Sequence, residues 1–142
     1  MSTAITSPRP IDRRDSQAAS FVTRWLQPSV AVIVAHGELD ACNAQELVEY
    51  ALRDADRIER LALDLTGIEF FGTAGFSALH TLNVRCAGAG VQWVMVPSLA
   101  VTRLLRICDP DSALPIANTM SAALTRLQAD QRRLLQLVTE PR

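Results

Sequence analysis

The chain has 142 residues, of which 49% are hydrophobic and 5% aromatic, and its formal net charge is -1. This length and composition suit one globular domain with an aliphatic core. The charge disfavours a nucleic acid as the main partner, because phosphate backbones are bound by basic surfaces. All 14 basic residues are Arg, which excludes a P-loop lysine and a Schiff-base lysine. We expect no cofactor and no metal, since no Cys/His cluster has ligand spacing.

Short apolar runs alternate with amphipathic segments along the chain. Strands are expected at residues 21–26, 30–35, 61–65, 91–96 and 114–117. Helices are expected after Asn43, with Glu46 completing a capping box, from Gly75 to about residue 87, after Ser98 and after Ser121. This alternation predicts an α/β fold, in which helices pack on a mostly parallel, possibly mixed, sheet of four or five strands.

Both ends of the chain differ in composition from the middle. Residues 1–20 are rich in Ser, Pro, Arg and Asp, and we expect a disordered leader there. Residues 21–128 are expected to form the domain and residues 129–142 a helical extension or tail. In that tail the polar residues 130–133 precede a second apolar patch. This patch either belongs to a helix that packs on the domain and frays at its end, or contacts another molecule. We expect the protein to be a monomer or a weak homodimer.

The expected location of the protein is the cytoplasm, away from membranes. No apolar run reaches the length of a membrane helix, and residues 1–20 lack the apolar segment of a secretory signal. The three cysteines are odd in number and widely spaced, as is typical of reduced thiols. Cys86 and Cys108 are expected on apolar helix faces, whereas Cys42, in a loop, is the better candidate for a redox role.

The segment 61–76 reads as a buried strand, a turn and the start of a helix. Gly72 and Gly75 bracket Thr73 and Ala74, so the backbone can turn sharply there. The beginning of a helix offers backbone N–H groups and the positive end of the helix dipole. The loop therefore suits a phosphate group or the surface of a partner protein.

Two motifs in this chain resemble the signature of the STAS domain family of bacterial anti-anti-sigma factors. The first is Gly37-Glu38-Leu39-Asp40, and the second runs from Asp64-Leu65-Thr66-Gly67 through Phe70-Phe71 to Gly75. The resemblance covers about residues 21–127. It implies a non-enzymatic anti-sigma factor antagonist, which binds an anti-sigma factor, usually a kinase of the histidine-kinase-like ATPase type, and so releases a sigma factor. The residues that it places in the binding face are Glu38, Asp40, Gly72, Thr73, Ala74, Gly75 and Phe76.

One departure from the family pattern concerns phosphorylation. The family sequence Asp-Ser-Ser-Gly stands here as Gly72-Thr73-Ala74-Gly75, and the serine that is usually phosphorylated aligns with Ala74. Thr73 is therefore the candidate phosphorylation site, and its phosphate would add about -1.5 to -2 units of charge.

Other interpretations remain open at these positions. Thr73 is also an ordinary turn or N-cap residue, and Asp40 could simply shape the chain before the next helix. The alternative function is a STAS sensory or scaffold module that responds to a small ligand or redox state without a phosphoswitch. We expect no enzymatic activity, because His36 and His80 have no companion residues that would make a catalytic triad.

Overall fold

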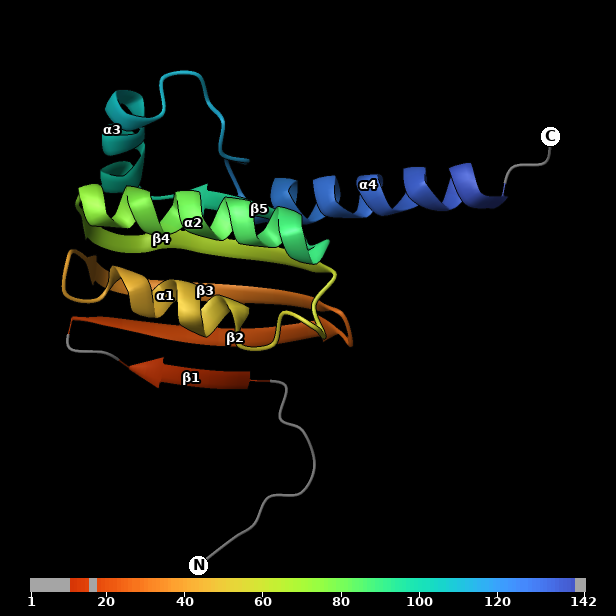
Figure 1. Ribbon diagram of the computed structural model, residues 1–142, viewed down its shortest axis with the longest axis horizontal. Helices are drawn as coiled ribbons and strands as arrows, with labels where there is room; N and C mark the ends of the chain where they lie inside the picture. The colour runs from red at the N-terminus through yellow and green to blue at the C-terminus, as the bar shows by residue number, and fades with distance from the viewer. Residues whose placement is uncertain (1–10, 16–17, 140–142) are drawn as a thin grey trace, which may run out of the picture.

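The computed structural model describes residues 11–15 and 18–139. Its sheet has five strands in the order β1-β2-β3-β4-β5 (Figure 1). The strands are β1 (Ile11–Asp15), β2 (Ala19–Gln27), β3 (Val30–Leu39), β4 (Arg60–Phe71) and β5 (Gln92–Pro97). The first two pairs are antiparallel, and β4 is parallel to both β3 and β5. The sheet is therefore mixed and five-stranded, within the predicted α/β class.

Helices cover both faces of the sheet. They are α1 (Ala44–Leu52), α2 (Thr73–Ala89), α3 (Leu99–Cys108) and α4 (Met120–Thr139). Figure 1 shows α1 and α2 side by side along one face, and α4 running past the end of the sheet. Helix α4 begins on the opposite face, where Ala123 and Leu127 join a separate apolar cluster with sheet residues. Alternate residues of each central strand thus enter different layers, as the two-residue period of a strand requires.

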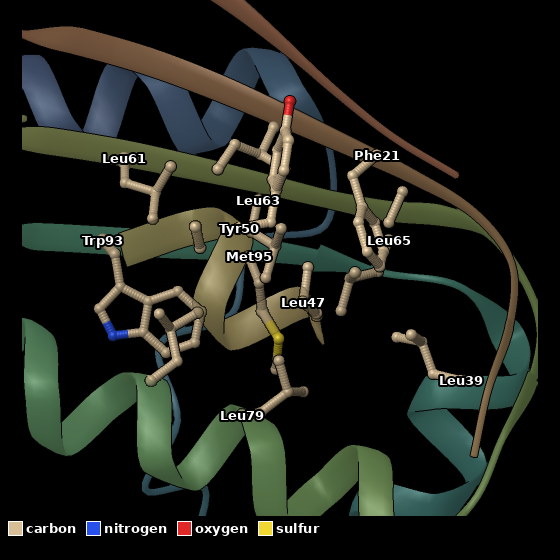
Figure 2. Close-up of a cluster of buried hydrophobic side chains, with 14 of the residues drawn as sticks. Phe21, Leu39, Leu47, Tyr50, Leu61, Leu63, Leu65, Leu79, Trp93 and Met95 are labelled. Atoms are coloured by element: carbon tan, nitrogen blue, oxygen red, sulfur yellow. The ribbon is translucent and has the colours of Figure 1, made fainter. Parts of the chain in front are cut away.

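The larger core lies between the sheet and helices α1, α2 and α3. Figure 2 shows leucines of β4 and Met95 of β5 on the side of the sheet that faces Leu47 of α1 and Leu79 of α2. Each fully buried Leu side chain contributes about 1.5–3 kcal/mol by leaving water. Tyr50 is also buried, and its phenol oxygen accepts a hydrogen bond of 2.7 Å from the Thr23 hydroxyl. This bond satisfies two polar groups that burial would otherwise leave without partners.

The structure corrects several predicted element boundaries. A disordered leader was expected at residues 1–20, but Ile11–Asp15 form β1 and Ala19 begins β2. The rest of the leader, residues 1–10 and 16–17, lies outside the described residues. The strand expected at 114–117 is only a bridge, in which the Met95 N–H donates to Pro115 and the Ala117 N–H donates to Met95.

Strand β4 is much longer than the expected 61–65. Thr66 and Gly67 were interpreted as a turn that ends the strand, but pairing with β3 continues to Phe71. Val34 and His36 of β3 are two positions apart, whereas their partners in β4, Asp64 and Gly67, are three positions apart. Strand β4 therefore contains one extra residue at this point. The carboxylate of Asp64 stabilises this bulge by accepting bonds of 2.9 and 2.7 Å from the Thr66 N–H and hydroxyl. The turn-forming residues Thr66 and Gly67 thus form a bulge, and the strand continues beyond them.

Helix α4 continues through residues 130–133, where the apolar pattern is interrupted. Its first turn is capped by Thr119, whose hydroxyl accepts from the Ala122 N–H at 3.0 Å, and not by the expected Ser121. Helix α3 begins after Ser98 as expected, and Ser98 caps it by accepting from the Val101 N–H at 3.2 Å. None of the described helices is long and apolar enough to cross a membrane.

Candidate functional site

Two loops meet at the end of the sheet where β3 and β4 finish. Because β3 and β4 are parallel, their carboxyl ends lie at the same edge, with Glu38 opposite Phe70. The Gly72 N–H then donates a hydrogen bond of 3.0 Å to the Leu39 carbonyl. The segment with Glu38 and Asp40 therefore lies beside the loop that begins at Gly72.

Asn43 fixes the shape of the first loop. It is only 2% exposed, and its side-chain amide donates to the Glu38 carbonyl at 2.8 Å and accepts from the Asp40 N–H at 3.0 Å. Asn43 has the N-cap position of α1 but makes no side-chain capping bond, so the expected capping box with Glu46 is wrong. The Asp40 carboxylate accepts from the Cys42 N–H at 2.9 Å. Asp40 thus shapes the turn, and Glu38 is exposed beside it.

The second loop leads directly into α2. The Gly72 carbonyl accepts from the N–H groups of Gly75 and Phe76 at 2.9 and 3.3 Å. Gly72 holds the N-cap position, so Thr73 is the first helical residue and is not the cap. Thr73 is exposed, and within the described part of the chain its hydroxyl makes no hydrogen bond. The Thr73 hydroxyl is accordingly accessible to another protein.

The next two residues face inward. Ala74 is half-buried and packs against a small cluster formed by α1 and α2, namely Ala44, Val48 and Ala78. Gly75 is buried, and a Cβ atom built on it would lie 2.4 Å from Cε1 of Phe71. Such a separation is far shorter than van der Waals contact, so the Phe71 ring occupies the space that a side chain would need. These two positions hold the start of α2 against α1 and β4.

Several apolar side chains lie at the same end of the sheet as the exposed threonine. Phe70 is 50% exposed, and its ring lies beside Gly72, where a Cβ atom would be 3.5 Å from Cε2 of the ring. Phe76 is half-buried and stacks on His80, with 6.3 Å between ring centroids. Leu99, at the start of α3, is 64% exposed at the same end of the sheet. Sequence reasoning missed Phe70 and Leu99, although Phe70 and Phe71 must point to opposite faces of one strand.

The charged and nucleophilic groups provide further information on the chemistry of the chain. Among the described residues, no three His, Cys, Asp or Glu side chains are placed to hold a metal ion. Cys86 is buried as expected, and burial raises the pKa of its thiol to about 11. Cys108 is half-buried, whereas Cys42 is exposed beside Asp40.

A family comparison covers both of these loops. The model of the STAS domain matches residues 26–123, which is more than half of the chain. The chain belongs to the STAS domain family. The matched residues include Asp40, Thr73 and Gly75, so the family match spans both joined loops.

Curated relatives of this STAS domain come from Mycobacterium tuberculosis. Osmosensory protein A is 33% identical over 135 residues, and the match covers 91% of this chain and 85% of that protein. Anti-sigma-F factor antagonist RsfA is 33% identical over 101 residues, covering 68% of this chain and 79% of RsfA.

Solved structures share the STAS fold with this chain. An anti-sigma factor antagonist from Mycobacterium paratuberculosis superposes with a TM-score of 0.67 at 22% identity, over 78% of this chain and 95% of that one. The anti-sigma factor antagonist SpoIIAA, in its unphosphorylated form, gives a TM-score of 0.63 at 14% identity, over 77% of this chain and 96% of its own. At these identities the similarity establishes the fold.

Proposed function

We propose that this STAS domain protein is an anti-sigma factor antagonist, which binds an anti-sigma factor and thereby releases a sigma factor. The observation that carries the proposal is the 33% identity to anti-sigma-F factor antagonist RsfA over 68% of the chain. Binding, without catalysis of its own, is the whole activity that we propose. The expected partner is an anti-sigma factor of the histidine-kinase-like ATPase type, and the expected compartment is the cytoplasm.

The proposed binding face is the edge formed by the two joined loops. It contains Glu38, Asp40 and the segment Gly72–Phe76, to which the exposed Phe70 ring adds an apolar contact. A partner that covered this edge would remove the Phe70 ring from water while meeting the carboxylate of Glu38. Apolar area at the centre and charge at the rim is the usual organisation of a protein interface.

Thr73 is the proposed switch within that face. Its exposed hydroxyl is the group there that a protein kinase could phosphorylate, since Ala74 has none. A carboxylate or phosphate at the first residue of α2 is compatible with the helix dipole, so the fold should tolerate it. At the interface, the same charge would have to be desolvated without a partner, which costs about 1–3 kcal/mol.

The test is a binding titration of candidate anti-sigma factors with wild-type protein, Thr73→Glu and Thr125→Glu. Thr125 is exposed on α4, away from the loops, and serves as the control for added charge. We expect Thr73→Glu to weaken binding by roughly 5- to 150-fold, which corresponds to about 1–3 kcal/mol, while Thr125→Glu binds like the wild type. Equal binding by all three proteins would contradict the proposed face.

A second experiment separates the switch from the face. Ala74→Ser restores the family serine, and incubation with the cognate kinase and ATP should add one phosphate, about 80 Da by intact mass. Wild-type protein should gain the same mass only if Thr73 is itself phosphorylated, and Thr73→Val should then remain unmodified. If neither wild-type protein nor Ala74→Ser is ever modified, while Thr73→Glu still weakens binding, the face stands and the phosphoswitch is wrong.

The alternative is a sensory or scaffold STAS module without a phosphoswitch. Two observations favour it: the 33% identity to Osmosensory protein A over 91% of the chain, and the alanine at the usual phosphorylation position. In that case no anti-sigma factor would bind at the loop edge. Monomer or weak homodimer remains our prediction for the oligomeric state.

A further inference from the structure

Arg60 places a positive charge inside the protein with little to neutralise it. It is the first residue of β4 and is only 6% exposed. Within the part of the chain that the structure describes, its one ionic contact joins Nη1 to Oε1 of Glu59 at 3.9 Å. The Glu59 side chain is 71% exposed, so water screens this contact strongly. A buried charge in this situation needs an ion or water molecules beside it.

A small cavity lies next to Arg60. Its volume is about 100 Å³, enough for a few water molecules or one carboxylate-sized group. Besides Arg60, its polar lining residues are Gln27 at the end of β2 and Gln128 of α4, and the other lining residues are apolar. The guanidinium has five N–H donors, and none of them is hydrogen-bonded to a described residue.

A larger cavity, which is open to solvent on one side, adjoins the small one. The two share Leu26 and Leu124 in their linings, and the larger has a volume of about 440 Å³. Six of its nine lining residues are apolar: Val22, Leu26, Val32, Val34, Met120 and Leu124. The polar three are Arg24, His36 and Asp64. Ligand sites are typically cavities of this size, largely apolar and with a few polar groups that orient the ligand.

We propose that the two cavities together bind a small amphipathic carboxylate. Its carboxylate group pairs with Arg60, because the planar guanidinium can donate two parallel hydrogen bonds to a carboxylate. Its apolar body occupies the larger cavity. The larger cavity holds both Arg24 and Asp64, whose charges oppose each other, and Arg24 is exposed, so water screens its charge. Arg60 is buried, and the carboxylate group is therefore expected beside it.

This site is separate from the proposed partner-binding face. It lies on the face of the sheet covered by α4, whereas the joined loops lead into α1 and α2 on the other face (Figure 1). The inference therefore goes beyond the anti-sigma factor antagonist role and does not depend on it. It gives a physical basis to the small-ligand response that the sequence left open as an alternative.

The test is calorimetric titration of the full chain with octanoate, with octanamide as the uncharged match, and with inorganic phosphate. We expect octanoate to bind at least tenfold more tightly than either octanamide or phosphate. Arg60→Met removes the charge and retains a long apolar side chain, and it should abolish this tenfold preference. Arg103→Met, which removes an exposed arginine of α3, should bind as the wild type does.

Two further variants test the larger cavity and the shape of the Arg60 side chain. Leu124→Trp fills the larger cavity and should weaken octanoate at least tenfold. Arg60→Lys retains the charge without the planar fork and should give an intermediate affinity, even if Arg60→Met fails to fold. The proposal is overturned if octanoate binds no better than octanamide, or if neither binds. Phosphate that binds as tightly as octanoate and is unaffected by Leu124→Trp would identify an inorganic anion site and overturn the amphipathic ligand.

Discussion

Gly75→Ala adds a single methyl group at the most crowded point of the candidate site. The new Cβ would lie 2.4, 2.7 and 2.9 Å from three carbon atoms of the Phe71 ring. Phe71 is only 5% exposed and belongs to the main core, so its ring cannot move outward without opening a space behind it. Either the ring or the first turn of α2 must shift.

The expected magnitude is a balance of two opposing effects. Overpacking of a core by a methyl-sized group costs about 1–3 kcal/mol. Replacing Gly by Ala in a helix stabilises the folded state by about 0.5–1 kcal/mol, because Gly loses more backbone entropy on folding. The net loss should be about 0.5–2 kcal/mol in the free energy of unfolding, which lowers the melting temperature by about 2–8 °C for a domain of this size.

Gly88→Ala is the matched control in the same helix. A Cβ atom at Gly88 meets nothing within 4 Å, so the helix preference acts alone and should raise stability by about 0.5–1 kcal/mol. Urea unfolding of both variants measures the difference directly. Phe71→Leu should reduce the penalty of Gly75→Ala when the two are combined, because the neighbours interact. A stabilising effect of Gly75→Ala equal to that of Gly88→Ala would refute the crowding argument.

Two other predictions concern buried polar and ionisable groups. Asn43→Ala leaves the Glu38 carbonyl and the Asp40 N–H without partners and should lower the free energy of unfolding by about 1–3 kcal/mol in urea; a loss no larger than that of the exposed Asn118→Ala would show that Asn43 does not organise the loop. Because burial raises the pKa of the Cys86 thiol to about 11 from 9.0, the native state favours the neutral thiol. This stabilisation is complete below pH 9.0 and is lost between pH 9.0 and about 11. Urea midpoints measured across that range should fall less in Cys86→Ala than in the wild type, and parallel falls would contradict the shift.

The order and type of the central elements could be predicted from the sequence. Apolar runs at Val30 and Leu61 and the helical spacing after Gly75 are strong local patterns, and they gave the parallel β3-β4-β5 unit with its helices. The position of the two loops at one edge follows from the same topology. Strand β1 could not be found this way, because its sequence is Ile-Asp-Arg-Arg-Asp and has no apolar periodicity. Its pairing depends on the neighbouring strand β2.

The details of the site depended on contacts between the end of β3 and the elements beside it. Thr66 and Gly67 carry ordinary turn signals, yet pairing with β3 on one side keeps them in β4 beyond the bulge. Asn43 and Glu46 fit a capping box, but the Asn43 side chain bonds to Glu38 and Asp40 instead. The Asn43 partners lie three and five residues before it, at the end of β3, and the capping-box rule considers only the residues that follow the cap. The cavity beside Arg60 could not be predicted either, because residues of β2, β3, β4 and α4 line it together.

The hydrogen bond from the Gly72 N–H to the Leu39 carbonyl uses backbone atoms at both ends. The shape of the joined loops is therefore largely independent of the side chain at position 73, and of whether position 74 carries a hydroxyl. Recognition and control can consequently change separately during divergence. Under the proposed function, a descendant chain that lost the phosphorylated hydroxyl would still present the same loop surface to its partner, and it would then act as an antagonist at all times.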